Sequence, residues 1–536
     1  MKKKTDDFDL KIVDEMVKDG KYENNIELDA VCQNAKDQAC MSDKSYKEFR
    51  KKIKPAADIA SLARCVEYKK KVDQFWHIQT NEKGAFIADP LSKIKFVCTK
   101  YLSLLENPQS THTFNILLSG DGFSLTKTHT NAFNFTFSLM NDGDLSYRGF
   151  YILGCFFNLY SIKNLIYIKF FKILIEGIFK ILKEDYENIK ISLNELIMQL
   201  SGVKDITIND VTYGIEFYLG GDLKWLSTVQ GISTANSNYP CPWCTWKSTP
   251  IKWTEKEINQ KWPNNERDHQ IAKVLCKEKV VEKKKGYINE SLFSFIPFAK
   301  SVVDPLHLFL RITDKLMDML LFRLKELDIK EKSFKLGDIS TRNITLNFLE
   351  YLKEEKTGCN LTSPYFIADK EFKLRSFNSN EKKKIIEKIS SNHFLNIFSK
   401  QIQEDRILNE IIEAFKDFKM INELLKINYF EFFKKTEIEL KIKSWLRKMI
   451  KLEPDITPYT HILGFHVVEF IEKYKDLKLF SMQGLEKLNH MTKISYLKQT
   501  MHHKDFTLCL LKKMNRLEFI HLQGSISDLN KKNHIV

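Results

Sequence analysis

The sequence predicts an α/β fold, because one part of the chain has the pattern of strands and the rest has the pattern of helices. Residues 132–140 place Phe133, Phe135 and Phe137 at alternate positions, which is typical of a strand with one face on a core. Residues 245–475 instead carry Lys and Glu on helical faces and show no such alternation. We therefore expect a β-rich unit followed by a large helical region.

The β-rich unit is expected to contain four strands and one helix, in the order β-β-β-α-β. Strands are expected at residues 114–119, 132–140, 147–157 and 212–219, with the helix at 166–187. Asn141-Asp-Gly-Asp supplies the turn between the second and third strands. This order is that of an RNase H-like fold, in which the first and fourth strands lie side by side.

Acidic residues stand where the first and fourth strands are expected to end. The apolar run that begins at Asn115 ends on Asp121, and the run that begins at Tyr213 ends on Asp222. Taken alone, Asp121 with its following glycine indicates only a strand that ends in a turn. Because the two strands are expected to be neighbours, their carboxylates should converge, and a third acid, Glu486, follows far downstream. Three carboxylates in one place form a site for a divalent metal.

The chain has a globular composition and a strongly basic charge. Its 536 residues are 43% hydrophobic and 12% aromatic, enough for roughly two to four domains with a sizeable core. The formal net charge is +15 and the pI is near 9.0, which suits a polyanionic partner such as nucleic acid. The alternative is that Lys, far commoner than Arg, only fills solvated helix faces.

Nothing in the sequence predicts secretion or a membrane span. Met1-Lys-Lys-Lys-Thr is followed by polar sequence without the apolar segment of a signal peptide. The most hydrophobic stretch, residues 150–182, is interrupted by charged residues, so no membrane partner is expected. Ten cysteines in an intracellular chain favour reduced thiols and a metal site.

One cysteine pair and one histidine pair have the spacing of zinc ligands. Cys241-Pro-Trp-Cys244 is a C-x2-C knuckle, which presents two thiolates to one tetrahedral ion. A redox pair is the alternative, but the prolines on both sides of Cys241 favour the knuckle. His461 and His466 are the candidates for the remaining ligands. Residues five apart point about 140° apart on an ideal helix, so both can face one ion only if His461 lies at a helix start, which Pro458 allows. Packed or surface histidines are the alternative.

Taken together, these motifs resemble the catalytic core of the V(D)J recombinase catalytic subunit and of Transib-type DDE transposases. The likeness covers roughly residues 110 to 510, in the family's order. The stretches that are similar are Ser119-Gly-Asp121-Gly with Asn134-Phe-Thr-Phe-Ser-Leu-Met, Gly220-Gly-Asp222 with Cys241-Pro-Trp-Cys244, Val303-Asp304-Pro-Leu-His307, the pair His461 and His466, and Gln483-Gly-Leu-Glu486-Lys-Leu-Asn489.

The resemblance implies a transposon-derived nuclease and polynucleotidyl transferase that cuts and joins DNA with two divalent metal ions. Asp121, Asp222 and Glu486 would be its catalytic residues and would hold Mg²⁺ or Mn²⁺. The ligands of a structural Zn²⁺ would be Cys241, Cys244, His461 and His466. His307 would support the helical region, approach DNA or be a packed core histidine.

The same resemblance implies where the chain acts and with which partners. Double-stranded DNA with sites like transposon ends is the implied substrate, a homodimer the implied assembly and the nucleus the implied location. An accessory protein would be a further partner. Lysines near Glu486 are the candidate DNA contacts: Lys487, Lys493, Lys498 and Lys504.

Four domains are expected from these patterns. Residues 1–110 are an N-terminal helical module for DNA binding or dimerisation, unless their basic faces are only those of ordinary soluble helices. Residues 111–240 are the β-rich part with the first two acids, 241–475 a helical insertion with zinc, and 476–536 the C-terminal helices that complete the core.

Two other functions stay open at this point. A catalytically silent, transposon-derived DNA-binding or interaction protein would keep the fold without the reaction. An RNase H-like nuclease would hydrolyse DNA without joining strands.

Overall fold

The computed structural model describes residues 62–522 and a few residues between 32 and 48. Apart from gaps of one or two residues, it does not describe residues 126–130, 158–184, 249–257, 260–265, 331–342, 358–376, 426–431 and 501–504. The expected helix at 166–187 therefore lies almost wholly outside the described residues, as does Lys504. So does most of the hydrophobic stretch at 150–182.

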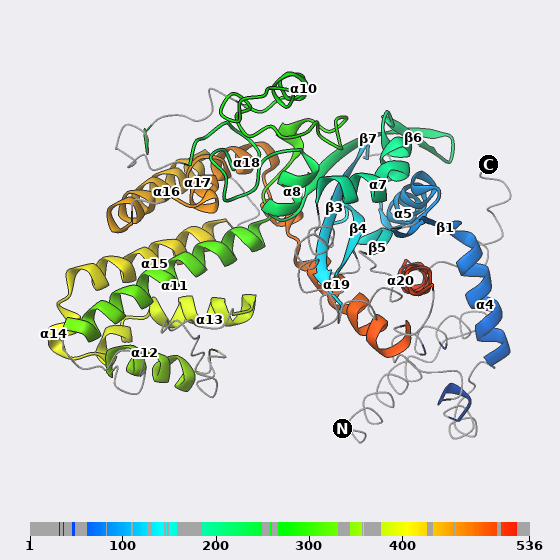
Figure 1. The fold of residues 1–536 in the computed structure, drawn as a ribbon. Coiled ribbons are helices and arrows are strands. Elements are labelled where there is room, and N and C mark those ends of the chain that lie inside the picture. Colours follow the sequence, from blue (N-terminus) through cyan, green and yellow to red (C-terminus); the bar gives the residue numbers. More distant parts are fainter. Residues whose placement is uncertain are drawn as a thin grey trace, which may run out of the picture.

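Seven strands form one mixed sheet in the order β1-β2-β5-β4-β3-β7-β6 (Figure 1). The strands are β1 (Ile78–Asn81), β2 (Gly84–Ile87), β3 (Thr113–Ser124), β4 (Asn131–Leu139), β5 (Tyr151–Phe157), β6 (Asp205–Ile208) and β7 (Val211–Gly220). The four strands expected from the sequence are present as β3, β4, β5 and β7. Phe133, Phe135 and Phe137 of β4 are all buried, as the alternation predicts.

Strands β3 and β7 are parallel neighbours, although most pairs in the sheet are antiparallel. Their register brings Ser119 opposite Gly220, so Asp121 and Asp222 each follow this pair by two residues. The expectation that the first strand ends before Asp121 is wrong. On its other edge β3 continues to pair with β4, Asp121 lying opposite Asn134, and this backbone pairing keeps the chain extended to Ser124.

The prediction that residues 1–110 are only helical is also wrong in the described part. β1 and β2 form a hairpin there, and β2 adds to the free edge of β5. The side chain of Asn81 accepts hydrogen bonds from the backbone N–H groups of Lys83 and Gly84, which closes the turn. Strands of four residues are too short to show a clear alternation. The helices α4 (Leu62–Phe75) and α5 (Pro90–Leu104) flank the hairpin.

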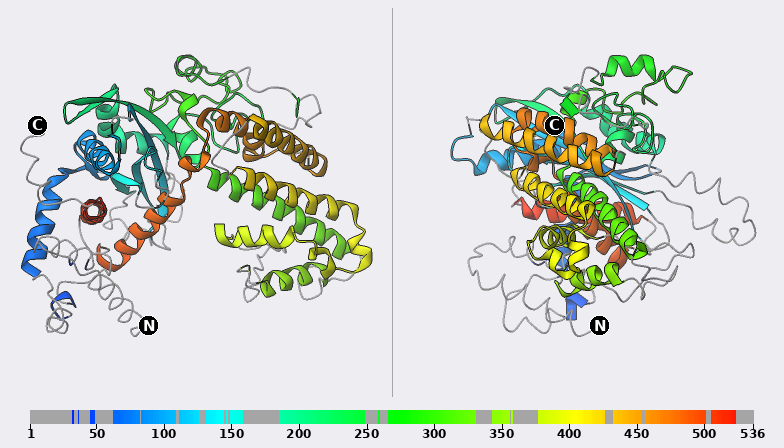
Figure 2. Two further views of the ribbon diagram at one scale, coloured as in Figure 1. Left: turned by 180° about the vertical axis from the view of Figure 1, so that it is seen from behind. Right: turned by 90° about the vertical axis from the view of Figure 1, so that its left-hand side faces the viewer.

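A separate helical lobe stands beside the sheet (Figures 1 and 2). It consists of α11 (Pro305–Lys330), α12 (Asn343–Glu354), α13 (Ser379–Ile389), α14 (Lys400–Gln403), α15 (Arg406–Leu424) and α16 (Phe432–Leu452). Trp445 of α16 is fully buried, and its indole N–H donates to the carbonyl oxygen of Ala414 in α15 at 3.1 Å. The helices of the lobe therefore pack on one another through buried apolar side chains, and these belong to the same hydrophobic core as those of the sheet.

The chain returns from the lobe to the sheet through short helices. These are α17 (Pro458–Phe465), α18 (Val467–Tyr474), α19 (Gln483–Ser495) and α20 (Phe506–His521). α19 packs against β3, and α20 packs along β5 and β2 (Figure 1). Two further helices, α7 (Tyr186–Leu200) and α8 (Leu223–Val229), lie on either side of the β6–β7 hairpin in the sequence.

A buried ion pair fastens α20 to the sheet. The ammonium group of Lys93 in α5 lies 2.5 Å from a carboxylate oxygen of Glu518 in α20 and also donates to the carbonyl oxygen of Ile152. The other oxygen of Glu518 accepts the backbone N–H of Ile152 at 2.8 Å. At Ile152, β5 extends past the end of β2, and no strand of the described residues pairs with it on that edge. The side chains of Lys93 and Glu518 therefore make the hydrogen bonds to the Ile152 backbone that a strand would otherwise make.

Among the described residues, no helix combines the length and the apolar character needed to cross a membrane.

Candidate metal centre and carboxylate site

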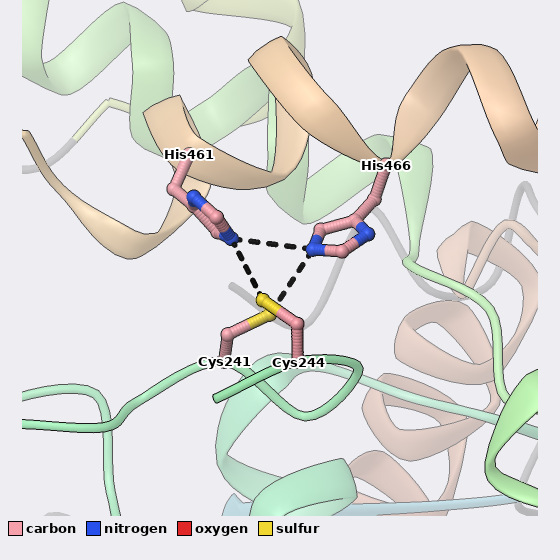
Figure 3. A group of neighbouring side chains, drawn as sticks. All are labelled: Cys241, Cys244, His461 and His466. Carbon is pink, nitrogen blue, oxygen red and sulfur yellow. Dashed lines mark hydrogen bonds between the residues drawn. The ribbon is translucent and has the colours of Figure 1, made fainter. Parts of the chain in front are cut away.

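Four side chains from distant parts of the chain meet at one buried point (Figure 3). Their ligand atoms all lie within 4.8 Å of one another, and the residues are Cys241, Cys244, His461 and His466. All four are 0–1% exposed. The structure therefore brings together the whole predicted zinc quartet, and these residues could hold a metal such as zinc.

The distances within the quartet fit a tetrahedral zinc ion. Cys241 Sγ lies 3.4 Å from His466 Nε2, Cys244 Sγ lies 3.4 Å from His461 Nε2, and the two Nε2 atoms are 3.2 Å apart. Zn–S bonds of about 2.3 Å and Zn–N bonds of about 2.0–2.1 Å at tetrahedral angles separate sulfur from nitrogen by about 3.5 Å and nitrogen from nitrogen by about 3.3 Å. Two thiolates and two imidazoles are also the donor set that zinc prefers in structural sites.

The two histidines face one point because the helix is interrupted between them. α17 begins at Pro458 with Thr457 as its N-cap, as the proline predicts, but His461 is the fourth residue of the helix. His466 lies between α17 and α18. Its ψ of −28° is helical, but its φ of −114° lies about 50° from the usual helical value. This φ turns the His466 side chain away from the direction of an unbroken helix, in which the two histidines would point about 140° apart.

The turn that carries the two cysteines is held by a buried arginine. Arg267 is 4% exposed, and its guanidinium donates to the carbonyl oxygens of Cys241 at 2.7 Å, Lys285 at 3.0 Å and Tyr239 at 3.2 Å. The same group lies 4.7 Å from the centre of the Tyr287 ring. The knuckle is therefore fixed by side-chain contacts that do not depend on a bound ion.

Aromatic rings and one carboxylate surround the histidines. Trp246 stacks on the His461 ring with centroids 4.2 Å apart, and His466 Nδ1 lies 3.6 Å from a Glu469 oxygen. Burial opposes charge on His466, but Cys241 and Glu469 raise its pKa to about 9. Burial also opposes ionisation of Cys241, yet the hydrogen bond from Cys244 and the imidazoles hold its pKa well below the usual range. Partners of this kind orient zinc ligands and favour the thiolate.

A second group of polar side chains gathers where β3 and β7 end. Asp121 of β3 accepts a hydrogen bond of 2.7 Å from the side-chain amide of Asn489 in α19. Asn489 in turn accepts one of 2.7 Å from Asn134, which is fully buried and directly opposite Asp121 in β4. Glu486 lies one turn before Asn489 on α19. The first and third predicted acids are thus placed by the same helix.

Asp222 caps a helix at the equivalent end of β7. Its Oδ1 accepts the backbone N–H of Trp225 at 2.7 Å, which makes Asp222 the N-cap of α8. Trp225 is fully buried, and a Cβ added at Gly120 or Gly221 would lie 2.5 Å or 2.2 Å from its ring. The indole of Trp225 packs directly on the backbone of Gly120 and of Gly221. This contact explains why a glycine precedes both Asp121 and Asp222.

Glu486 faces His307, to which the sequence left three roles open. His307 Nε2 lies 3.6 Å from Glu486 Oε1, and its Nδ1 donates to Asp304. Burial lowers the pKa of His307, but Asp304, Asp222 and Glu486 raise it to about 9. Burial and the charges of Asp304 and Asp222 raise the pKa of Glu486, against the effect of His307. At neutral pH, His307 is thus a cation among carboxylates.

Asp304 ties these elements together. One of its oxygens accepts the backbone N–H of Leu306 at 2.9 Å and that of Met482 at 3.0 Å, so it caps the start of α11 and holds the start of α19. It is 1% exposed. Of the three roles open to His307, supporting the packing of α11 against α19 is the one that these contacts favour.

The structure brings the three acids to neighbouring elements without closing them into one cluster. Within the described residues, only the Cys/His quartet brings three or more potential metal ligands close enough together to bind one ion, and the three acids do not. Of the four predicted DNA-contacting lysines, Lys487 and Lys498 are exposed, Lys493 is partly buried, and Lys504 lies outside the described residues.

Several residues of both sites were given no role from the sequence, although Asn134, Asp304 and Asn489 stand in the stretches that carry the resemblance. They are Arg267 at the knuckle, Asn134 and Asn489 beside Asp121, and Asp304 beside His307. The strand at 131–139 gave one signal, since Asn134, Thr136 and Ser138 are polar side chains between the phenylalanines, and all three are buried. Arg267 gave no signal, because an arginine in a polar segment is usually solvated.

No protein-family model matches the chain, and no curated protein matches its sequence.

Proposed function

We propose that the chain is a DDE-type DNA endonuclease and strand transferase with an RNase H-like core, a structural zinc and a catalytic divalent metal. The observation that carries the proposal is the placement of Asp121 and Asp222 at the same end of the parallel neighbours β3 and β7. Glu486 lies on α19, which packs against β3 and is bonded to Asp121 through Asn489. The neighbouring strands β5, β4, β3 and β7 follow the order that such a core requires.

The donor set fits a hard divalent cation such as Mg²⁺ or Mn²⁺. Asp121, Asp222 and Glu486 would hold it with carboxylate oxygens, the ligands that these ions prefer. Burial raises the pKa of Glu486, and the nearby charges of Asp304 and Asp222 raise it further against the effect of His307. When bound, the metal would supply Lewis-acid activation of the attacking oxygen and stabilise the leaving oxygen at phosphorus.

The chain's own residues then have separate tasks. Asn489 orients Asp121, and the backbone of Trp225 orients Asp222. Asp304 sets the distance between α11 and α19, and so places Glu486. Exposed lysines on α19, such as Lys487, would bind the DNA backbone beside the acids.

Nicking of supercoiled plasmid in Mg²⁺ or Mn²⁺ tests this proposal. We expect the wild-type protein to nick, and Asp121→Asn, Asp222→Asn and Glu486→Gln to lower the rate by at least about 100-fold, as expected for loss of transition-state charge stabilisation. These substitutions remove the anion but keep an oxygen that accepts the same hydrogen bonds. DNA binding should be nearly unchanged in all three.

A matched variant separates chemistry from folding. Asp185 caps α7 as Asp222 caps α8, accepting the backbone N–H of Asn188 at 2.9 Å, but it is not at the site. Asp185→Asn should therefore nick at the wild-type rate. If Asp185→Asn and Asp222→Asn lowered the nicking rate equally, the cause would be the lost helix cap and not the lost metal ligand.

One contact favours the catalytically silent alternative. The cation of His307 lies 3.6 Å from Glu486 and balances its charge without any metal. A folded, zinc-loaded protein that binds DNA but does not nick it would support a transposon-derived DNA-binding protein in place of the enzyme.

A further inference from the structure

The zinc-bearing helix α17 reaches the backbone beside Asp222. The N–H of Leu223 points to the hydroxyl oxygen of Tyr459 at 3.4 Å. Leu223 is the first residue of α8, and the N–H groups of a first helical turn have no partner within their own helix. Tyr459 lies two residues before His461 and is the second residue of α17.

From this contact we infer that Tyr459 is a positioning residue, which transmits the state of the zinc centre to Asp222. His461 fixes α17 when it holds the ion, α17 fixes the Tyr459 hydroxyl, and the hydroxyl fixes the start of α8, where Asp222 is the cap. This inference rests on the proposed function, because it assigns to Asp222 the role of a metal ligand.

The surroundings of the hydroxyl agree with this role. The hydroxyl lies near the carboxylates of Asp222, which caps α8, and of Asp304, which caps α11. α17 also packs on α11, which Asp304 caps and whose first turn carries His307. The zinc helix therefore touches both elements that flank the carboxylate site.

Removal of one oxygen atom is the direct test. Tyr459→Phe keeps the ring and deletes the hydroxyl, so zinc content and melting temperature should stay at their wild-type values. The peptide that contains Leu223 should exchange its amide hydrogens faster, by about fivefold, the size of one lost hydrogen bond. Binding of Mn²⁺ to the DNA-free protein should weaken by a similar factor, and nicking should need more Mn²⁺ while DNA affinity is unchanged.

A second tyrosine on the adjoining helix is the matched control. Tyr474 is the last residue of α18, and its hydroxyl donates to the carbonyl oxygen of Ala299, away from the acids. Tyr474→Phe should leave exchange at Leu223 and Mn²⁺ affinity unchanged. Equal effects from both variants would overturn the inference, since they would show only that a lost hydroxyl loosens these helices.

The link to zinc is tested by removing the ion with a chelator. In the wild-type protein, exchange at Leu223 should rise to the level of Tyr459→Phe, while Leu117 in the buried part of β3 stays protected. In Tyr459→Phe, the chelator should add nothing at Leu223. If zinc removal leaves Leu223 protected in the wild type, the inference is wrong.

These readouts separate the two proposals. Faster exchange at Leu223 in Tyr459→Phe, in a protein that neither binds Mn²⁺ nor nicks DNA, would overturn the proposed function and with it the role of Asp222 as a metal ligand. Nicking that needs Asp222 but not the Tyr459 hydroxyl would uphold the enzyme and overturn the role of Tyr459.

Discussion

Each predicted catalytic acid is held by a different kind of hydrogen-bond donor or cation. Asp121 accepts a neutral side-chain amide, Asp222 accepts a backbone N–H, and Glu486 faces a charged imidazole. Among these partners only the imidazole, that of His307, changes its charge in the range of ordinary buffers. Substitution of His307 should therefore change how the stability of the protein depends on pH, whereas substitution of Asn489 should not.

His307 should make the stability of the protein depend on pH. Its pKa is raised to about 9 in the folded state, so the charged form stabilises the fold fully below about pH 6.5, and this contribution is lost as pH rises through 9. We expect the free energy of unfolding to fall by roughly 2–3 kcal/mol over that window and His307→Gln to remove most of the fall. Urea unfolding at pH 6.5, 8 and 9.5 measures this. The exposed His393→Gln should keep the wild-type profile.

The glycines before the two acids should tolerate no larger side chain. Gly120→Ala places a methyl group against the ring of Trp225, and we expect a loss of about 1–3 kcal/mol of stability from overpacking. Gly221→Ala should cost more, because it meets the same ring and also needs a φ of +150°. Thermal unfolding compares both with Gly202→Ala, where φ is +87° but nothing lies within 4 Å. Similar losses at all three would exclude the indole contact as the cause.

Among the secondary-structure elements, α17 and α18 show how an interrupted helix can make a metal site. His466 joins α17 to α18 with a φ of −114°, and α17 packs on α16 and α11. In addition, the knuckle turn is held by Arg267. Both halves of the site are thus supported, and a bound ion would join two elements more than 200 residues apart in sequence.

Loss of zinc should destabilise this junction. Cys244→Ser should lose the ion and lower the free energy of unfolding by about 3–5 kcal/mol, because metal binding is coupled to folding. Metal analysis of the purified protein should find one zinc per chain in the wild type. Cys276→Ser removes a thiol outside the quartet and should keep both the zinc and the stability. A wild-type protein without zinc would contradict the assignment.

The sequence predicted those features that a short stretch of neighbouring residues determines. The alternation of Phe133, Phe135 and Phe137 was enough for β4, and the spacing Cys241-x2-Cys244 was enough for half of the metal centre. Strands β1, β2 and β6 were not predicted, because four residues carry too little periodicity. The continuation of β3 beyond Asp121 depends on pairing with β4 and could not be read from the Asp-Gly sequence alone.

The side chains and backbone groups that hold the acidic residues are, in contrast, far from them in the sequence. Asn489 is 368 residues from Asp121, and Met482 is 178 residues from Asp304. Contacts of this kind have no local pattern, so only the acids themselves could be predicted and not the side chains that hold them. His461 and His466 were predicted because their spacing matches that of the two zinc histidines in the family that the sequence resembles.

For the whole molecule, the net charge of +15 should govern association with DNA. Lys487→Ala with Lys498→Ala should reduce the slope of log affinity against log salt by about 2, if each lysine neutralises one phosphate. Fluorescence anisotropy with a labelled duplex at several salt concentrations measures the slope. The equally exposed pair Lys190→Ala and Lys204→Ala on and after α7 should leave it unchanged. A wild-type affinity independent of salt would mean that the charge only keeps the protein soluble.

The distance in sequence between Asp121 and Asn489 also has a consequence for biosynthesis. A ribosome adds about 5–20 residues per second, so α19 leaves it roughly 20–70 s after β3. During that interval the nascent chain carries first one and then two of the three acids, and it lacks Glu486. Under the proposed mechanism, a polypeptide released before Glu486 has been added would be unable to cut DNA, and the protein could not harm a genome before α19 had been made.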